Sequence, residues 1–196
     1  MRVSFLGDSL TEGHPGESFL RRLERLLPAD ELFNLGRAGD TVPSLLARLR
    51  AGGVPPADAA VVWIGTNDAL LGDWYLPPLS DDARRLRPVY DAVLDLALDA
   101  SPLVACVPPL LPDPFAGAVA QRVAGIAAMV AAAAAARAPR TLVFDLAPAF
   151  AAAAGGAGAA GAFTIDGVHL NARGADVVAT AFRGLIDRLR VRSAGV

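Results

Sequence analysis

The chain has 196 residues, 54% of them hydrophobic and 19% charged, and a formal net charge of −2 at pH 7. This much apolar surface excludes intrinsic disorder, and the length predicts a single domain over residues 1–196. All 18 basic residues are arginines, scattered among 20 acids without a dense basic block. Neither nucleic acid nor anionic lipid is therefore expected as the main partner.

The cysteine and histidine content restricts metal and redox chemistry. Cys106 is the single cysteine, which excludes an internal disulfide, and with only His14 and His169 beside it no Cys/His zinc site is expected. The apolar start at 1–6 is too short for the core of a secretory signal. We expect a cytoplasmic protein, although a secreted chain that had lost its signal would look the same. The sequence does not indicate an oligomeric state.

Strand and helix patterns alternate along the chain. Short apolar runs, rich in β-branched and aromatic residues, predict strands at 2–6, 32–35, 60–64, 103–107 and 141–145. Longer patterns predict helices at 19–27, 42–49, 82–100, 113–137 and 171–190. This alternation predicts an α/β protein, a three-layer α/β/α sandwich with a five-stranded parallel sheet. Right-handed crossovers limit the strand order, and among the doubly wound topologies we expect the flavodoxin-like order 2-1-3-4-5.

Two apolar segments need separate interpretation. The longest apolar run, 123–136, is shorter than the ~20 residues of a membrane span, so we predict a buried helix and no integral membrane segment. Asp113 is the expected N-cap of that helix and Pro114 its first residue. The Ala/Gly-rich stretch 151–162 favours a helical turn followed by a loop, because its glycines disfavour a continuous helix.

Chemically useful residues follow four of the five predicted strands. In an open parallel sheet, ligands bind outside the carboxyl ends of the strands, so the residues just after each strand are the informative ones. We therefore expect a nucleophile, a base, an acid and several hydrogen-bond donors at one edge of the sheet. The four segments are Gly7-Asp8-Ser9-Leu10-Thr11, Gly36-Arg37-Ala38-Gly39-Asp40-Thr41, Gly65-Thr66-Asn67-Asp68 and Asp166-Gly167-Val168-His169.

Ser9, His169 and Asp166 are the residue types of a serine-nucleophile site. A serine hydroxyl needs a base to remove its proton, and an imidazole works best when a carboxylate fixes its tautomer. The turn at Gly167 allows Asp166 to fold back onto Nδ1 of His169, which leaves Nε2 for the serine.

Acyl transfer also needs donors for the oxygen that becomes negative in the transition state. The N–H groups of Ser9 and Gly39 and the side-chain amide of Asn67 can supply them. Taken one at a time, the same residues have purely structural interpretations. Residues 9–12 match a helix capping box, 166–167 an ordinary turn, and Asn67 a helix N-cap.

The joint occurrence of these residues, in this order and at successive strand ends, favours the catalytic interpretation. His14 is a competing base because it is close to Ser9 in sequence. Its only nearby carboxylates are Glu12 and Glu17. We expect His14 to be a loop residue near the cleft.

At these residues the sequence resembles the SGNH hydrolases, also called GDSL esterases and lipases, from Gly7 to about Gly174. The segments that carry the resemblance are Gly7-Asp8-Ser9-Leu10-Thr11, Gly65-Thr66-Asn67-Asp68 and Asp166-Gly167-Val168-His169-Leu170-Asn171. The resemblance implies a flavodoxin-like sheet and no cofactor. It also implies Ser9 as nucleophile, His169 as base, Asp166 as its partner, and an oxyanion hole of Ser9 N–H, Gly39 N–H and Asn67.

The second segment matches the family less well, since it contains two glycines and has Ala38 where serine is frequent. Gly39 is preferred because Gly-Asp-Thr is the better match and Thr41 can cap the next helix. Gly36 remains the alternative.

The expected activity is hydrolysis of carboxylic esters, thioesters or acetylated substrates through an acyl-enzyme, with a small-molecule ester as partner. One alternative is acyl transfer by the same residues, and another is a noncatalytic flavodoxin-like binding module. Apolar loop residues after the third and fourth strands are candidates for substrate binding, with ordinary packing as the competing interpretation. They are Trp74, Tyr75, Leu110 and Phe115.

Overall fold

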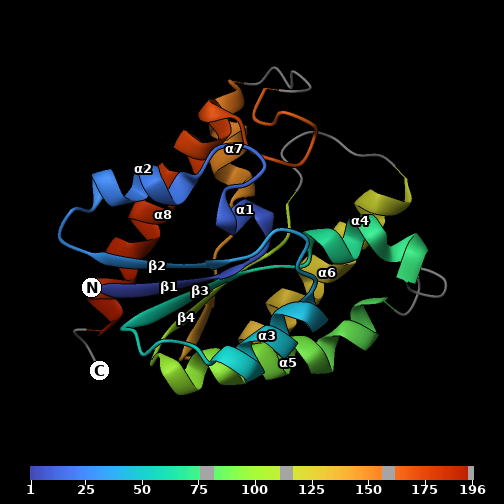
Figure 1. The fold of residues 1–196 in the computed structure, drawn as a ribbon, viewed down its shortest axis with the longest axis horizontal. Helices are drawn as coiled ribbons and strands as arrows, with labels where there is room; N and C mark the ends of the chain where they lie inside the picture. Colours follow the sequence, from blue (N-terminus) through green and yellow to red (C-terminus); the bar gives the residue numbers. More distant parts are fainter. Residues whose placement is uncertain (76–81, 111–116, 156–161, 194–196) are drawn as a thin grey trace.

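A five-stranded parallel sheet with the order β2-β1-β3-β4-β5 lies at the centre of the molecule (Figure 1). The structure is a computed structural model and describes residues 1–75, 82–110, 117–155 and 162–193; the side chains of 72–75 and 82 lie outside that description. The predicted fold class and strand order are confirmed. The strands are β1 (Arg2–Gly7), β2 (Glu31–Gly36), β3 (Ala59–Trp63), β4 (Val104–Val107) and β5 (Thr141–Val143).

The central strands end level with one another. Gly7 at the end of β1 is in register with Gly36 at the end of β2 and with Trp63 at the end of β3. Because all three strands run in parallel, the segments that follow them open at the same edge of the sheet.

Helices cover both faces of the sheet (Figure 1). One face carries α2 (Phe19–Leu26), α7 (Ala147–Ala154) and α8 (Ala172–Ser193). The other carries α3 (Val42–Gly52), α5 (Asp82–Ala100) and α6 (Ala118–Ala135). Two helices directly follow central strands, namely α1 (Ser9–Glu12) after β1 and α4 (Thr66–Tyr75) after β3. These two elements lie at the edge where the site was expected.

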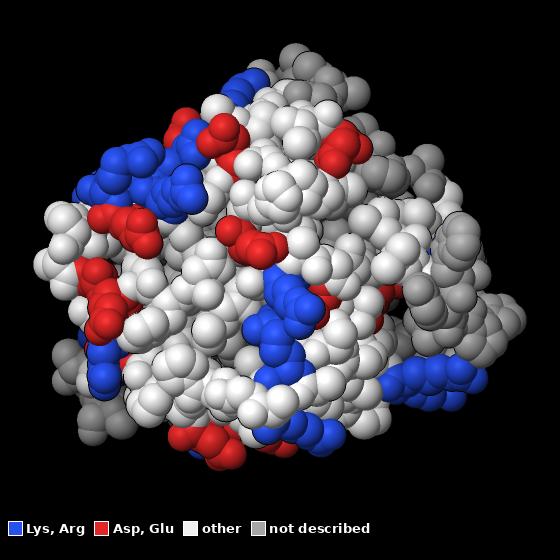
Figure 2. Space-filling view, viewed as in Figure 1, with Lys and Arg blue, Asp and Glu red and all other residues white. Residues whose placement is uncertain are grey.

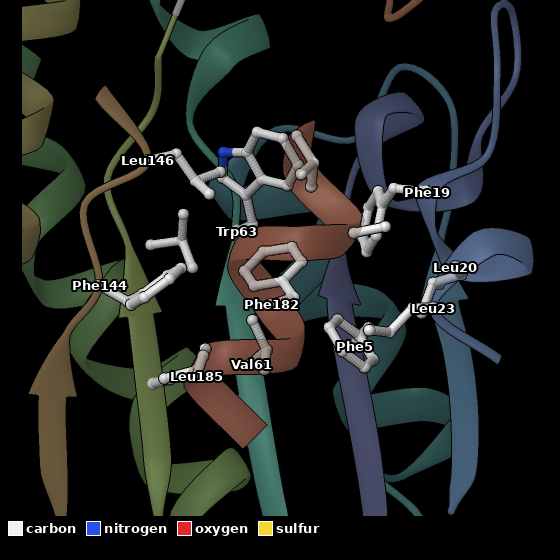
Figure 3. Packing of buried hydrophobic residues seen from close by; sticks show 14 of the residues in the cluster. Phe5, Phe19, Leu20, Leu23, Val61, Trp63, Phe144, Leu146, Phe182 and Leu185 are labelled. Carbon is white, nitrogen blue, oxygen red and sulfur yellow. The ribbon is translucent and has the colours of Figure 1, made fainter. Parts of the chain in front are cut away.

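The two faces are packed with different side chains. Under α2 and α8 the core is aromatic, and Phe182 lies at its centre (Figure 3). Its ring centroid is 5.1 Å from that of Phe19, 5.6 Å from Phe5 and 6.0 Å from Trp63. The face under α3, α5 and α6 is mainly aliphatic. Both clusters contain residues of β1, β3 and β4, so the central strands are buried on both sides, as expected of a parallel sheet.

Several predicted boundaries were wrong. Trp74 and Tyr75 were predicted as loop residues but belong to α4, because the helix that begins at Thr66 is not interrupted by glycine at position 72. The helix predicted from Asp113 has Gly117 as its N-cap, without a side-chain cap hydrogen bond, and begins at Ala118. Asp113 and Pro114 themselves lie outside the described residues. The Ala/Gly-rich stretch shows the expected helical turn, since α7 continues to Ala154.

The helix predicted as buried is buried along one face only. By length and composition alone, the 18 residues of α6 could cross a membrane, and 33% of that window is buried inside the protein. Ile126, Met129 and Val130 pack into the aliphatic core, whereas Ala124 and Ala128 are exposed.

Charges of both signs are interspersed on the surface. On the face seen in Figure 2, basic and acidic groups lie close together rather than in separate regions. Ion pairs account for part of this pattern, for example Arg22 with Asp176 at 2.6 Å and Arg137 with Asp91 at 2.6 Å.

Candidate active site

Ser9 lies where β1 gives way to α1. Asp8 is the N-cap of α1, and its Oδ1 accepts a hydrogen bond from the Leu10 N–H at 3.0 Å. Ser9 is therefore the first residue of the helix, and its hydroxyl is free for another partner. The capping-box interpretation of residues 9–12 is wrong, because Asp8 is the cap and the Glu12 carboxylate accepts the N–H of Ala38 at 2.6 Å.

The structure brings Ser9, His169 and Asp166 together, although Ser9 and His169 are 160 positions apart. Ser9 Oγ is 3.1 Å from Nε2 of His169, and Nδ1 of His169 is 2.6 Å from Oδ2 of Asp166. The other carboxylate oxygen of Asp166 accepts the backbone N–H groups of Val168 at 3.0 Å and His169 at 2.8 Å. The spacing of three thus lets one carboxylate hold both the backbone and the ring of the histidine.

The charge state of Asp166 determines the tautomer of His169. Burial raises the pKa of Asp166, but hydrogen bonds from the His169 ring and from the N–H groups of His169 and Val168 outweigh it, so the pKa lies below its usual value. An ionised carboxylate accepts hydrogen bonds only, and Nδ1 must then carry the proton. Nε2 is left with its lone pair toward the Ser9 hydroxyl, the arrangement that a general base requires.

Residues 162–171, which we call the base loop, are closed by their own hydrogen bonds. The N–H of Ile165 donates to the His169 carbonyl at 2.8 Å, and the N–H of Asn171 donates to the Phe163 carbonyl at 3.0 Å. The Asn171 side chain also accepts the Gly174 N–H at 3.0 Å, at the start of α8. The position of His169 is therefore fixed to α8, which packs on the aromatic core.

His14 does not occupy the position of the base. Its backbone N–H donates to the Ser9 carbonyl at 3.3 Å, and its side chain is exposed. In the described part of the chain, the imidazole that contacts Ser9 Oγ is that of His169. His14 follows α1 in the segment that adjoins the base loop, where the Glu17 N–H donates to the Leu170 carbonyl at 2.8 Å.

The geometry distinguishes the two glycines proposed for the oxyanion hole. Gly36 donates its N–H to Oδ1 of Asn34 at 3.0 Å, and a Cβ at Gly36 would lie 2.2 Å from the Glu12 nitrogen. Because Gly36 has no side chain, β2 and α1 can pack closely against each other at this position. Gly39 has a φ of +80°, lies in an exposed turn, and among the described residues has no acceptor for its N–H. Of the two, Gly39 has the available donor.

Residues 37–41, which we call the oxyanion loop, are bonded to the start of α4. Nδ2 of Asn67 donates to the Asp40 carbonyl at 2.9 Å, which uses one of its two N–H groups and leaves the second. The carboxylate of Asp68 accepts the Val42 N–H at 3.0 Å. Asn67 lies within α4 rather than at its cap, so the predicted capping role is wrong.

Three buried carboxylates lie beneath this edge of the sheet. Asp8 is 1% exposed, and Asp40 and Asp68 are each 6% exposed. Burial raises the pKa of Asp8 to about 7; the Leu10 N–H opposes this, and the nearby charges of Asp68 and Asp40 add to it. Burial likewise raises the pKa of Asp68 to about 6, against the N–H of Val42. Asp40 is paired with Arg48 at 2.7 Å.

The roles of Glu12, Asp40 and Asp68 were missed by sequence reasoning. Each stands within or next to a segment that was singled out, but the partner of its carboxylate is 8 to 26 positions away. The signal available was only that acids cluster at strand ends. In the described parts of the chain, no group of three or more His, Cys, Asp or Glu side chains is placed to hold a metal ion.

The predicted substrate-binding residues are only partly described. Leu110 is half-buried and packs against the aromatic core. Trp74 and Tyr75 form the end of α4, but their side chains are outside the description, as is Phe115 entirely. Their proposed role in substrate binding stays a prediction.

Residues 5–177 match the GDSL-like Lipase/Acylhydrolase family. The chain therefore belongs to this family of SGNH hydrolases, as the sequence motifs predicted, and it is an esterase or acylhydrolase of the GDSL type. No curated protein sequence matches the chain significantly.

Solved structures of similar fold include two acetylxylan esterases. The acetyl xylan esterase AlAXEase is 20% identical with a TM-score of 0.78, over 95% of this chain and 100% of that one. Axe2, an acetylxylan esterase from Geobacillus stearothermophilus, is 19% identical with a TM-score of 0.75, over 92% and 91%. A lipolytic protein of the G-D-S-L family from Veillonella parvula DSM 2008 is 19% identical with a TM-score of 0.77, over 96% and 99%. At these identities the likeness is one of fold.

Proposed function

We propose that the protein hydrolyses carboxylic esters through an acyl-enzyme formed on Ser9. The observation that carries this proposal is the continuous chain of contacts from Ser9 Oγ to His169 Nε2, at 3.1 Å, and from His169 Nδ1 to Asp166 Oδ2, at 2.6 Å. A hydroxyl, an imidazole and an ionised carboxylate in this sequence form the arrangement that activates a serine.

The first half-reaction forms the acyl-enzyme. Ser9 Oγ attacks the carbonyl carbon while its proton passes to His169 Nε2, and Asp166 stabilises the imidazolium that results. The carbonyl oxygen becomes negative and accepts hydrogen bonds from Ser9 N–H, Gly39 N–H and the second N–H of Asn67. The tetrahedral intermediate then collapses, and the leaving alcohol takes the proton from His169.

Water completes the cycle by the same steps. It attacks the acyl carbon as His169 accepts its proton, and collapse of the second intermediate releases the carboxylic acid and returns the proton to Ser9 Oγ. The side chains of His169 and Asp166 are 21% and 46% exposed. Access of solvent to the base favours hydrolysis over transfer to an alcohol, since transfer requires that water be excluded from the acyl-enzyme.

The proposal is tested by reaction of the purified chain with a fluorophosphonate and with p-nitrophenyl acetate. We expect the wild-type chain to be labelled at Ser9 and to release p-nitrophenol, and Ser9→Ala to do neither. Ser4→Ala is the matched control, because Ser4 is a buried serine of β1 whose hydroxyl has no hydrogen-bond partner among the described residues. Turnover by Ser9→Ala at the wild-type rate would refute the nucleophile.

The substrate class can be determined with a panel of ester substrates. The fold shared with acetylxylan esterases supports acetylated xylan as a first candidate. We would compare it with p-nitrophenyl esters of increasing acyl length and with an acyl-CoA thioester. The highest kcat/KM on short acetyl esters would support a deacetylase, and a rise with chain length would support a lipase.

A further inference from the structure

We propose that Glu12 and Asp68 are positioning residues of the oxyanion hole, which hold the oxyanion loop on both sides of Gly39 and so fix its N–H relative to Ser9 and Asn67. The inference rests on the proposed function, because it concerns the same site. It adds two residues that act through the donors rather than on the substrate.

The oxyanion loop has little packing of its own. Arg37, Ala38 and Gly39 are exposed, and a Cβ built at Gly39 would meet nothing within 4 Å. Within the turn, the Asp40 N–H donates to the Arg37 carbonyl at 3.1 Å, and at its start the Arg37 N–H donates to the Gly7 carbonyl of β1 at 3.1 Å. Van der Waals contact therefore cannot define where the Gly39 N–H points, and hydrogen bonds from outside the loop must do so.

Two carboxylates supply such bonds. Glu12 accepts the Ala38 N–H at 2.6 Å, one residue before Gly39. Asp68 accepts the Val42 N–H at 3.0 Å, three residues after Gly39. Hydrogen bonds to ionised acceptors are shorter and stronger than neutral ones. Carboxylates therefore hold Ala38 within the loop and Val42, the first residue of α3, directly after the loop.

Each carboxylate belongs to an element that also carries another oxyanion donor. Glu12 is the last residue of α1, whose first residue is Ser9. Asp68 directly follows Asn67 in α4. The three donors therefore come from three segments joined by side-chain bonds. Glu12 attaches the oxyanion loop to α1, and Asp68 attaches Val42, directly after the loop, to α4. Donors act in catalysis only when their mutual geometry is set before reaction, and shifts of about 1 Å are costly.

The other polar contacts of the loop do not perform this function. Arg48 pairs with Asp40 at 2.7 Å and donates to the Leu35 carbonyl at 2.8 Å, so it joins the loop to α3 and β2, which carry no donor. Asn67 donates to the Asp40 carbonyl but is itself one of the three donors. Unlike Asn67, Glu12 and Asp68 can be changed without removing a donor.

The experiment compares an oxygen ester with its sulfur analogue in Glu12→Ala and Asp68→Ala. A thiocarbonyl sulfur accepts hydrogen bonds poorly, so an intact oxyanion hole favours p-nitrophenyl acetate over p-nitrophenyl thionoacetate. We expect each variant to lower kcat for the oxygen ester about 10-fold with KM nearly unchanged, and to lower the oxygen-to-sulfur rate ratio by a similar factor. A merely structural role would slow both esters equally.

Conservative variants and a matched control complete the test. Glu12→Gln and Asp68→Asn keep an acceptor oxygen and should recover most of the rate ratio. Asp58→Ala removes a bond of the same kind, from the Arg2 N–H to the Asp58 carboxylate at 2.7 Å, at the opposite edge of the sheet, and should leave the ratio unchanged. If Asp68→Ala does not fold, because Asp68 is buried, the comparison of Glu12→Ala with Glu12→Gln decides.

The outcomes separate this inference from the proposed function. Wild-type turnover that depends on Ser9, together with a rate ratio unchanged in the Glu12 and Asp68 variants, would overturn the positioning role alone. A ratio that falls equally in Asp58→Ala would do the same. A wild-type chain that hydrolyses neither ester, or does so without Ser9, would overturn both.

Discussion

The base loop and the oxyanion loop both adjoin Ser9, yet they are held in opposite ways. In the base loop, the carboxylate that orients His169 is three positions away, and the backbone bonds that close the loop join residues within it. In the oxyanion loop, the anchoring side chains Glu12, Asn67 and Asp68 come from segments 26 or 27 positions distant.

This difference has a physical consequence. The base loop can form from its own few residues, and only its docking against Ser9 depends on the rest of the chain. The oxyanion loop has no defined geometry until α1, α4 and β2 have assembled. Substitutions in the base loop should therefore remove proton transfer and leave the fold intact, whereas substitutions around the oxyanion loop should change transition-state binding and local stability together.

The largest effects on turnover are expected from substitutions in the base loop. His169→Ala should reduce kcat/KM for p-nitrophenyl acetate by about 10⁴-fold or more, and the double variant with Ser9→Ala should be little worse than either single one, because the two act as a unit. Asp166→Asn should lose comparably or less, through the wrong imidazole tautomer. Thermal unfolding should show each variant to be folded. Independent, multiplying losses would contradict a shared role.

The next largest effect is expected at Asn67, the donor of α4 that bonds to the oxyanion loop. Asn67→Ala should lower kcat by about 10²-fold to 10³-fold, roughly 3–4 kcal/mol, with KM nearly unchanged, because the donor matters most in the transition state. Asn67→Asp should be at least as harmful, since it replaces a donor with a negative charge and also loses the bond to the Asp40 carbonyl. Comparison of kcat and Tm for both variants checks this. An active, stable Asn67→Asp would remove Asn67 from the site.

Substitution of the two glycines Gly36 and Gly39 sharpens the comparison of the two loops. Gly39→Ala has space for its methyl group but must adopt φ near +80°, so we expect a loss of about 1–2 kcal/mol of stability and a roughly 10-fold lower kcat as the N–H moves. Gly36→Ala places a methyl group 2.2 Å from the Glu12 nitrogen and should chiefly destabilise the fold. Chemical denaturation and kcat per folded molecule separate the two. Loss of kcat in folded Gly36→Ala alone would restore Gly36 as the donor.

The smallest effect on turnover is expected at Asp8, which caps α1 and touches no reacting atom. Its pKa is about 7 in the folded chain and 3.8 when unperturbed, so the folded state holds the proton more tightly and the free energy of unfolding should fall as pH rises from about 4 to about 7. Asp8→Asn should flatten this dependence in denaturation measured across that range, while Asp68 retains a smaller slope up to about pH 6. A slope that is unchanged in Asp8→Asn would contradict the raised pKa.

What the sequence predicted follows the same division. The parallel sheet was predictable because short apolar runs alternate with helices. Right-handed crossovers only limit the strand order, and the resemblance to the SGNH hydrolases implied the flavodoxin-like one. Asp166 and His169 were recognisable because their spacing carries the chemistry. The helical position of Trp74 and Tyr75 was missed because Gly65, the residue before α4, has no side chain to cap it, and Asn67, the expected cap, lies inside the helix. The hydrogen bonds that Glu12 and Asp68 accept were missed because their donors lie in other segments. The pattern within one segment does not indicate which backbone N–H of another segment will lie next to it.

The distance along the chain between Ser9 and His169 has a consequence during synthesis. The two residues are separated by 160 positions, so at ~5–20 residues per second a ribosome makes His169 roughly 8 to 32 s after Ser9. Throughout that interval the serine has no base and remains an ordinary hydroxyl. Nascent chains of this hydrolase are therefore expected to stay inert toward esters until nearly all of the chain has been translated and α8 has docked.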